Sequence, residues 1–297
     1  MKIIDCFNYF DEDMLLDLRL NILNKHVFKF IICEANYSHK GVSKKLNFDI
    51  KNFKKFKDKI IYIPLEEQPS NLKKIADSDD DNVKNSKIIE NCLIREELQR
   101  NYVMNKISKF DDQDLIIYGD LDEIPNLENF VYKNKISLFC QKMFYYKFNL
   151  IYPGHQWFGT KACKKKHLIS PQLLRFIKSK KYPFWRIDTI FSKLKYINMN
   201  IIYDGGWHFC NIRNPEELHY KMQNFAHHLE YDSSGIKVED LREKISNRKV
   251  FYDHAADKTD IDKYKSSINL EVVQDKFLPR FLVENKDFYK EWFEVKQ

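Results

Sequence analysis

The first 125 residues switch regularly between two spacings of apolar positions. Short continuous apolar runs, which are typical of buried strands, occupy residues 2–7, 27–33, 59–64 and 115–118. Apolar residues that recur every three or four positions, which are typical of helices, occupy residues 11–24, 48–56 and 86–110. The resulting order, β-α-β-α-β-α-β, predicts a mostly parallel sheet with helices on both faces.

The rest of the chain has a more mixed pattern. It predicts strands near residues 138–147 and 199–203, and helices near residues 214–230 and 235–246. Residues 66–86 are polar and predict a surface loop. Because no repeat or linker interrupts the chain, we predict a single α/β domain over residues 1–297.

Composition fits a globular protein, since 43% of the 297 residues are hydrophobic and 31% are charged. The net charge of +7 comes mainly from lysines, which we interpret as scattered over a solvated surface. The alternative is attraction to an anion, such as a nucleotide diphosphate, a phosphorylated glycan or a membrane surface. A nucleic-acid partner is not expected, because we find no dense basic run interleaved with aromatic residues.

The sequence predicts a cytoplasmic protein with at most peripheral membrane contact. Residues 1–7 have the pattern of a strand rather than of a signal peptide, and no run of 18 apolar residues occurs. The six cysteines form no C-x-x-C pair and no zinc-binding spacing, so reduced core cysteines are expected.

The clearest chemical signal is a pair of acidic residues directly after the strand at 115–118. Asp120 and Asp122 are separated by one residue, so their carboxylates can point the same way and share a cation. Mg²⁺ or Mn²⁺ held there could neutralise a diphosphate leaving group. Ligands of parallel sheets bind beyond the carboxyl ends of the strands, which is where this pair should lie.

Other candidates for binding a donor substrate are less specific. Gly205 and Gly206 permit a close approach of a ligand to Trp207 and His208. Arg95 and Arg100 could reach donor phosphates or simply form surface ion pairs. Lys161, at the end of a Trp157–Lys161 segment that could form a loop over the acceptor, is a further candidate binding residue.

Several segments, taken in order along the chain, resemble glycosyltransferase family 17. The similar segments are Asp5-Cys6-Phe7 with Glu12 to Arg19, Phe30 to Ala35, Arg95 to Asn101, Asp120 to Pro125, Gly206 to Phe209, Phe225 to His227, and Leu278 to Leu282 with Asn285 and Phe288. The Asp120-Leu121-Asp122-Glu123-Ile124-Pro125 match is the most distinctive.

The resemblance implies a GT-A fold, a UDP-GlcNAc donor, a divalent metal ion and inversion at the anomeric carbon, with a β-1,4 linkage. It also implies that His208 is a further metal or diphosphate ligand. Residues 1–125 would form the nucleotide-sugar half and residues 126–297 the acceptor half. The acceptor, an oligosaccharide or a glycolipid, and the oligomeric state are not implied.

The inverting reaction needs a carboxylate as general base. Asp188 ranks first among the candidates, before Glu123 and Asp204. Three other functions stay open at this point: a glycan- or nucleotide-binding module without catalysis, a metal-dependent phosphoesterase, and a transferase that uses another UDP-sugar.

Overall fold

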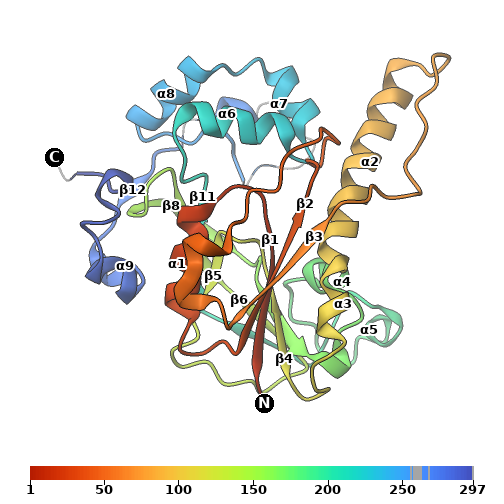
Figure 1. Ribbon diagram of the computed structural model, residues 1–297, viewed down its shortest axis with the longest axis vertical. Helices are drawn as coiled ribbons and strands as arrows, with labels where there is room; N and C mark the ends of the chain where they lie inside the picture. Colours follow the sequence, from red (N-terminus) through yellow and green to blue (C-terminus); the bar gives the residue numbers. More distant parts are fainter. Residues whose placement is uncertain (255, 257–262, 267, 296–297) are drawn as a thin grey trace.

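The computed structural model describes residues 1–254, 256, 263–266 and 268–295. A seven-stranded sheet and a five-stranded sheet form its framework (Figure 1). In spatial order, the larger sheet consists of β10 (Met199–Ile202), β6 (Ile136–Phe139), β9 (Lys161–Lys164), β4 (Leu115–Tyr118), β1 (Ile3–Tyr9), β2 (Lys29–Ala35) and β3 (Ile60–Leu65). The smaller sheet consists of β12 (Glu271–Val272), β8 (Leu150–Trp157), β7 (Gln141–Tyr145), β11 (Gly206–Cys210) and β5 (Glu123–Pro125).

The predicted parallel arrangement of the first strands is confirmed. Neighbouring strands from β4 through β1 and β2 to β3 are all parallel, and β9 is antiparallel to both β4 and β6. The larger sheet is therefore mostly parallel, as the predicted α/β GT-A-type fold requires.

Helices cover both faces of the larger sheet. They are α1 (Asp13–Leu23), α2 (Asp81–Tyr102), α3 (Met104–Ile107) and α4 (Pro171–Phe176). Leu115 and Ile117 of β4 pack into the core that includes α1, whereas Ile116 and Tyr118 pack into the core on the side of α2, α3 and α4. The alternation of strand side chains thus explains why the sheet is buried on both faces.

A third core lies beside the smaller sheet. It joins β7 and β8 to α6 (Pro215–Asn224), α7 (His228–Ser234) and α8 (Val238–Ser246), with Tyr231 and Leu241 fully enclosed. Figure 1 shows these helices above the carboxyl ends of β1 and β2. Two short helices, α5 (Asp188–Phe191) and α9 (Arg280–Glu284), lie at the periphery.

Several predicted elements differ from those in the structure. α2 begins at Asp81 rather than near residue 86, because the side chain of Asp80 accepts a hydrogen bond from the backbone N–H of Val83 at 2.9 Å. The predicted helix at 214–230 is two helices, since Phe225 has extended backbone angles. The predicted strand at 138–147 is two strands in different sheets, which separate at Cys140.

All six cysteines lie in the described part of the chain, where each is buried and none forms a disulfide. Among the described residues, no helix has the length and apolar character needed to cross a membrane.

Candidate active site

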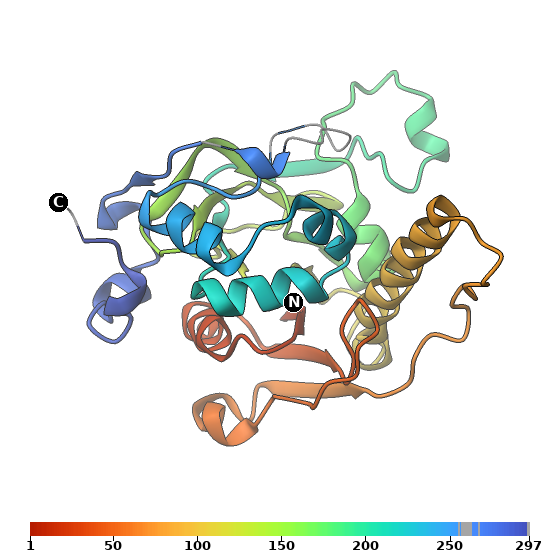
Figure 2. The ribbon, with the colours of Figure 1, turned by 90° about the horizontal axis from the view of Figure 1, so that it is seen from above.

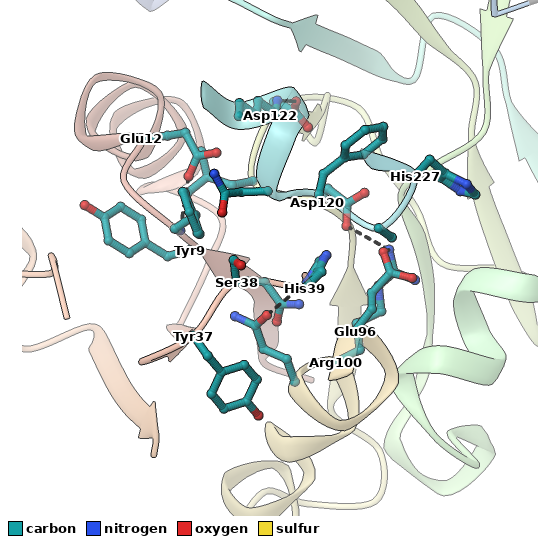
Figure 3. Close-up of a pocket in the computed structure, with 18 of the residues that line it drawn as sticks. Tyr9, Glu12, Tyr37, Ser38, His39, Glu96, Arg100, Asp120, Asp122 and His227 are labelled. Carbon is teal, nitrogen blue, oxygen red and sulfur yellow. Dashed lines mark hydrogen bonds and ion pairs between the residues drawn. The ribbon is translucent and has the colours of Figure 1, made fainter. Parts of the chain in front are cut away.

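A cavity of about 270 Å³ opens beyond the carboxyl ends of β1, β2 and β4 (Figure 3). Its lining comes from the ends of these strands and from β11, α2 and α6 with the residues that follow it. The charged and imidazole side chains in this lining are Glu12, His39, Glu96, Arg100, Asp120, Asp122, His208, Lys221 and His227. The cavity lies at the edge of the sheet to which the sequence assigned Asp120 and Asp122, and both residues line it.

The backbone of the Asp120–Glu123 loop is anchored by a buried arginine of α1. Arg19 has no solvent exposure, and its Nη1 donates to the carbonyl oxygens of Asp120, Leu121 and Glu123 at 2.9, 3.1 and 2.9 Å. Its Nε and Nη2 donate to the two carboxylate oxygens of the equally buried Asp5 at 2.8 and 2.7 Å. The bidentate pair fixes the guanidinium, which in turn fixes the path of the loop.

Glu123 holds the same loop in place through its own hydrogen bonds. Its fully buried carboxylate accepts hydrogen bonds from the indole Nε1 of Trp157 at 2.6 Å, the backbone N–H of Asp120 at 2.9 Å and Nη1 of Arg175 at 2.5 Å. A Cβ atom at Gly159 would lie only 1.9 Å from Oε1 of Glu123, so only glycine fits at that position. Glu123 is therefore enclosed and does not line the cavity.

Two arginines face the carboxylate of Asp120. Nη2 of Arg175 lies 2.7 Å from Oδ2, and Nη2 of Arg100 lies 3.6 Å from Oδ1. Burial raises the pKa of Asp120, but these two cations outweigh burial and hold the pKa below its usual value. Asp120 is therefore an anion at neutral pH.

The neighbouring carboxylate, Asp122, has looser contacts. Its Oδ1 lies 3.6 Å from Nε2 of His208, and its Oδ2 lies 3.9 Å from Nζ of Lys221. Burial raises the pKa of Asp122, but His208 and Lys221 more than offset this effect and lower it well below its usual range. These distances exceed those of hydrogen bonds, so the carboxylate oxygens remain able to bind a further cation.

The donor set of the loop fits a divalent metal ion that takes part of its shell from substrate. Asp120 and Asp122 would supply carboxylate oxygens. Burial lowers the pKa of His208, but the charge of Asp122 outweighs burial and raises it, so His208 would supply an imidazole nitrogen only after losing its proton. Within the part of the chain that the structure describes, no group of three or more acidic, histidine or cysteine side chains is close enough to hold a metal ion by itself. The remaining ligands would have to be diphosphate oxygens and water.

The structure brings some of the sequence-predicted residues to the cavity and leaves others outside it. Those that line it are Arg100, Asp120, Asp122 and His208, and those that do not are Arg95, Glu123, Lys161, Asp188 and Trp207. Trp207 and His208 are adjacent in β11 and so face opposite sides of the sheet. The indole of Trp207 donates to the carbonyl of Phe277 at 2.8 Å, away from the cavity.

Two of the residues outside the cavity support its walls. Arg95 donates to the carbonyl oxygen of His39 at 3.2 Å and so stabilises the loop after β2. The ammonium of Lys161 donates to the carbonyl oxygens of Arg175 and Ile177 at the end of α4. Both residues therefore position neighbours of the cavity and do not face it.

Asp188, the first-ranked base candidate, lies in the surface segment 178–195 that follows α4. Its carboxylate pairs with Arg186 at 2.7 Å and Lys195 at 2.7 Å. This placement does not support a role as general base. Asp204 is also largely exposed, pairs with Lys142 and does not line the cavity.

Sequence reasoning missed Arg175 and Lys221. Arg175 sits in the short helix α4, whose only sequence signal is the Ser170-Pro171 start that caps it. Lys221 lies on α6, four residues before the predicted motif at Phe225. Neither residue is near Asp120 or Asp122 in sequence, so only the folded chain shows the contacts.

Comparison with known proteins gives the class of this protein. The model of a glycosyltransferase family matches residues 1–162, which is more than half of the chain. The protein is therefore a glycosyltransferase. The family is glycosyltransferase family 17, and the chain belongs to it.

Other comparisons are distant. A search of curated protein sequences gave no significant match. Solved structures with some similarity include galactosyltransferase LgtC in complex with donor and acceptor sugar analogues, at 12% identity and a TM-score of 0.26 over 56% of this chain. The match spans 59% of that LgtC chain. An active-site mutant of LgtC matches at 12% identity and a TM-score of 0.28, over 68% of this chain and 72% of the other.

Proposed function

We propose that this glycosyltransferase transfers N-acetylglucosamine from UDP-GlcNAc to a hydroxyl group of a glycan acceptor, with inversion at the anomeric carbon, in a reaction that needs Mn²⁺ or Mg²⁺. The β-1,4 linkage and the donor follow the family resemblance. The observation that carries the proposal is the meeting of Asp120, Asp122, His208, Arg100 and Lys221 in one cavity at the carboxyl ends of parallel strands.

The charges in the cavity suit a nucleotide diphosphate. A divalent metal ion held by Asp120 and Asp122 would stabilise negative charge on the leaving diphosphate. Arg100 and Lys221 line the same cavity and can contact phosphate oxygens directly. Nε2 of His208 lies 3.6 Å from Oδ1 of Asp122, and the centroid of its ring lies 4.7 Å from that of the Trp157 indole. These two contacts fix the position of the imidazole in the wall of the cavity.

The transfer forms one bond and breaks another. The acceptor oxygen bonds to C1 of the sugar while the bond from C1 to the diphosphate oxygen breaks, and a carboxylate accepts the hydroxyl proton. Besides the Asp120–Glu123 loop, the carboxylates that line the cavity are Glu12 and Glu96.

Glu96 is the better candidate for the general base. Both oxygens of Glu12 are occupied, because Oε2 accepts the backbone N–H groups of Phe10 and Asp11 at 3.1 Å and Oε1 pairs with Arg213 at 3.0 Å. Glu96 has one ion pair among the described residues, with Arg100 at 2.9 Å. Its second oxygen can therefore accept a proton, and we assign the role to Glu96.

The division into a nucleotide-sugar half and an acceptor half is part of the proposal. Residues before 125 supply Asp120, Asp122 and Arg100, whereas later residues supply His208 and Lys221. Donor and acceptor would then meet where the two halves face each other.

The test is release of UDP from UDP-GlcNAc in the presence of an oligosaccharide acceptor, with Mn²⁺ or with a chelator. We expect turnover with Mn²⁺, none with the chelator, and loss of turnover in Asp122→Asn. Asp112→Asn, a change of an exposed aspartate paired with Lys165 at 3.1 Å, is the matched control and should keep full activity. UDP-Gal and UDP-Glc assayed in parallel identify the donor.

Full activity under chelation would exclude the proposed metal. Binding of UDP-GlcNAc without any release of UDP would favour a binding module instead.

A further inference from the structure

Segment 178–195 exposes an unusual amount of apolar surface. Five large apolar side chains within eight residues are between 67% and 84% exposed: Phe184, Trp185, Ile187, Ile190 and Phe191. Scattered single apolar residues are normal on a protein surface, but five large ones within one short segment indicate an interaction site. The phenyl ring of Phe184 lies edge-on to the indole of Trp185, with ring centroids 5.1 Å apart, so the two form one unit.

The same segment concentrates positive charge. It contains six basic residues and one acidic residue, a net charge of +5 in a chain whose total is +7. The basic residues are Lys178, Lys180, Lys181, Arg186, Lys193 and Lys195. The expectation of evenly scattered lysines is therefore wrong for this part of the surface.

The segment projects from the body of the molecule as a loop whose two ends are joined. The backbone N–H of Lys178 donates to the carbonyl oxygen of Leu194 at 2.8 Å and joins its two ends. Inside, Asp188 pairs with Arg186 and Lys195, so the one acidic residue is already neutralised. Figure 2 shows the segment projecting beyond α4, with α5 at its outer edge.

We propose that segment 178–195 docks the enzyme on an anionic lipid bilayer. Aromatic side chains prefer the interface between lipid headgroups and acyl chains, and the aliphatic side chains can insert beside them. Lysine and arginine extend their charged ends to the headgroups while their stems lie along apolar surface. Each basic residue close to an anionic leaflet adds to the attraction.

The charge favours a membrane over a second copy of this chain. In a symmetric dimer built on this surface, the segment would meet its own copy. Two segments of charge +5 would then face each other, and like charges across an interface oppose binding. An anionic bilayer satisfies the apolar and the charged groups together.

This docking surface is separate from the cavity but connected to it through one helix. The segment begins two residues after α4, whose Arg175 contacts Asp120 and Glu123. The enzyme would thus be held at a membrane on the side of α4.

The test is sedimentation of the full chain with vesicles, in the absence of donor, acceptor and metal. We expect binding to vesicles of phosphatidylcholine with phosphatidylglycerol, weak binding to phosphatidylcholine alone, and weaker binding at high salt. The double variants Trp185→Ser/Phe191→Ser and Lys180→Glu/Lys181→Glu should each bind anionic vesicles at least tenfold less. Phe288→Ser, which changes a 77% exposed phenylalanine elsewhere, should bind like the wild type.

Thermal unfolding of each variant shows that it is folded. The proposal is overturned if the wild type does not sediment with anionic vesicles, or if both double variants sediment as well as it does. A wild type that is dimeric, and that becomes monomeric in Trp185→Ser/Phe191→Ser without any change in vesicle binding, would assign the surface to a second copy. Because no catalysis is measured, failure here leaves the proposed transferase activity untouched.

Discussion

The Asp120–Glu123 loop and segment 178–195 are both connections beside α4, but they differ in what surrounds them. The carbonyl oxygens of the loop accept hydrogen bonds from a fully buried arginine, and its glutamate is enclosed by Trp157 and Arg175. The segment exposes five large apolar side chains to solvent, and its two ion pairs, of Asp188 with Arg186 and with Lys195, lie within it. The first is positioned by the core, whereas the second is free to meet an external partner.

The two roles that we propose for these regions make different demands on the structure. A site for a nucleotide sugar needs carboxylates held to a fraction of an ångström, and buried long-range contacts provide that. A surface that binds a fluid bilayer needs exposed apolar and basic side chains but no fixed geometry. The following predictions test this comparison.

The largest expected effect is on the anchor of the loop. Arg19→Met leaves Asp5 buried without its cation and removes three hydrogen bonds from the loop, so the free energy of unfolding should fall by about 3–5 kcal/mol. Denaturant unfolding measures it. Arg280→Met, which removes an arginine from the exposed pair with Glu284, should change the midpoint little. Equal stability of Arg19→Met and the wild type would show that the loop has other support.

The next prediction compares a carboxylate of the cavity with one of the surface segment. Glu96→Gln should lower kcat by about 100-fold or more, because a positioned general base typically contributes that much. Asp188→Asn should keep kcat close to that of the wild type. Both variants should retain affinity for UDP. The reverse result would restore Asp188 as the base and remove Glu96 from that role.

A smaller effect concerns the support of α4. Burial, and then the charge of Arg175, lower the pKa of Lys161 to about 7. The folded state therefore binds fewer protons than the unfolded state between about pH 7 and pH 10, so this residue makes stability rise with pH in that window. The contribution is at most about 1.4 kcal/mol per pH unit.

Lys161→Met should lose this part of the pH dependence. Denaturant unfolding at pH 7.5 and pH 9.5 compares the two proteins. If the free energy of unfolding changes with pH to the same extent in Lys161→Met and in the wild type, Lys161 remains charged in the folded state.

The smallest effect is expected in the segment. Phe184 is 82% exposed, so Phe184→Ser should change the free energy of unfolding by less than about 0.5 kcal/mol. A thermal or denaturant melt measures this. A loss of more than 1 kcal/mol would mean that the side chain packs against the body in solution, contrary to the contrast drawn above.

The local pattern of apolar residues was enough to predict the central sheet and the position of Asp120 and Asp122 at its edge. The apolar run at 115–118 identified β4, and the rule for parallel strands placed Asp120 and Asp122 at its carboxyl end. The same rule could not find Arg19 as an anchor, because its partners lie 101 to 104 residues away. Arg175, 55 residues from Asp120, was missed for the same reason.

Neighbouring residues also misled the prediction. Trp207 was predicted to contact the donor and His208 to bind the metal or the diphosphate, but the alternation of β11 sends only His208 to the cavity. Asp188 was predicted as a base from its distance along the chain. That distance does not reveal that Asp188 lies in a projecting segment whose ends are joined by the hydrogen bond from Lys178 to Leu194. Side-chain direction and loop closure depend on tertiary structure, so a single sequence does not fix them.

The most direct test of the metal and donor site is calorimetric titration of UDP with and without Mn²⁺. In the wild type, Mn²⁺ should tighten UDP binding at least tenfold, and Asp122→Asn should abolish that gain while Asp112→Asn preserves it. Equal UDP affinity of wild type and Asp122→Asn in the presence of Mn²⁺ would contradict the account.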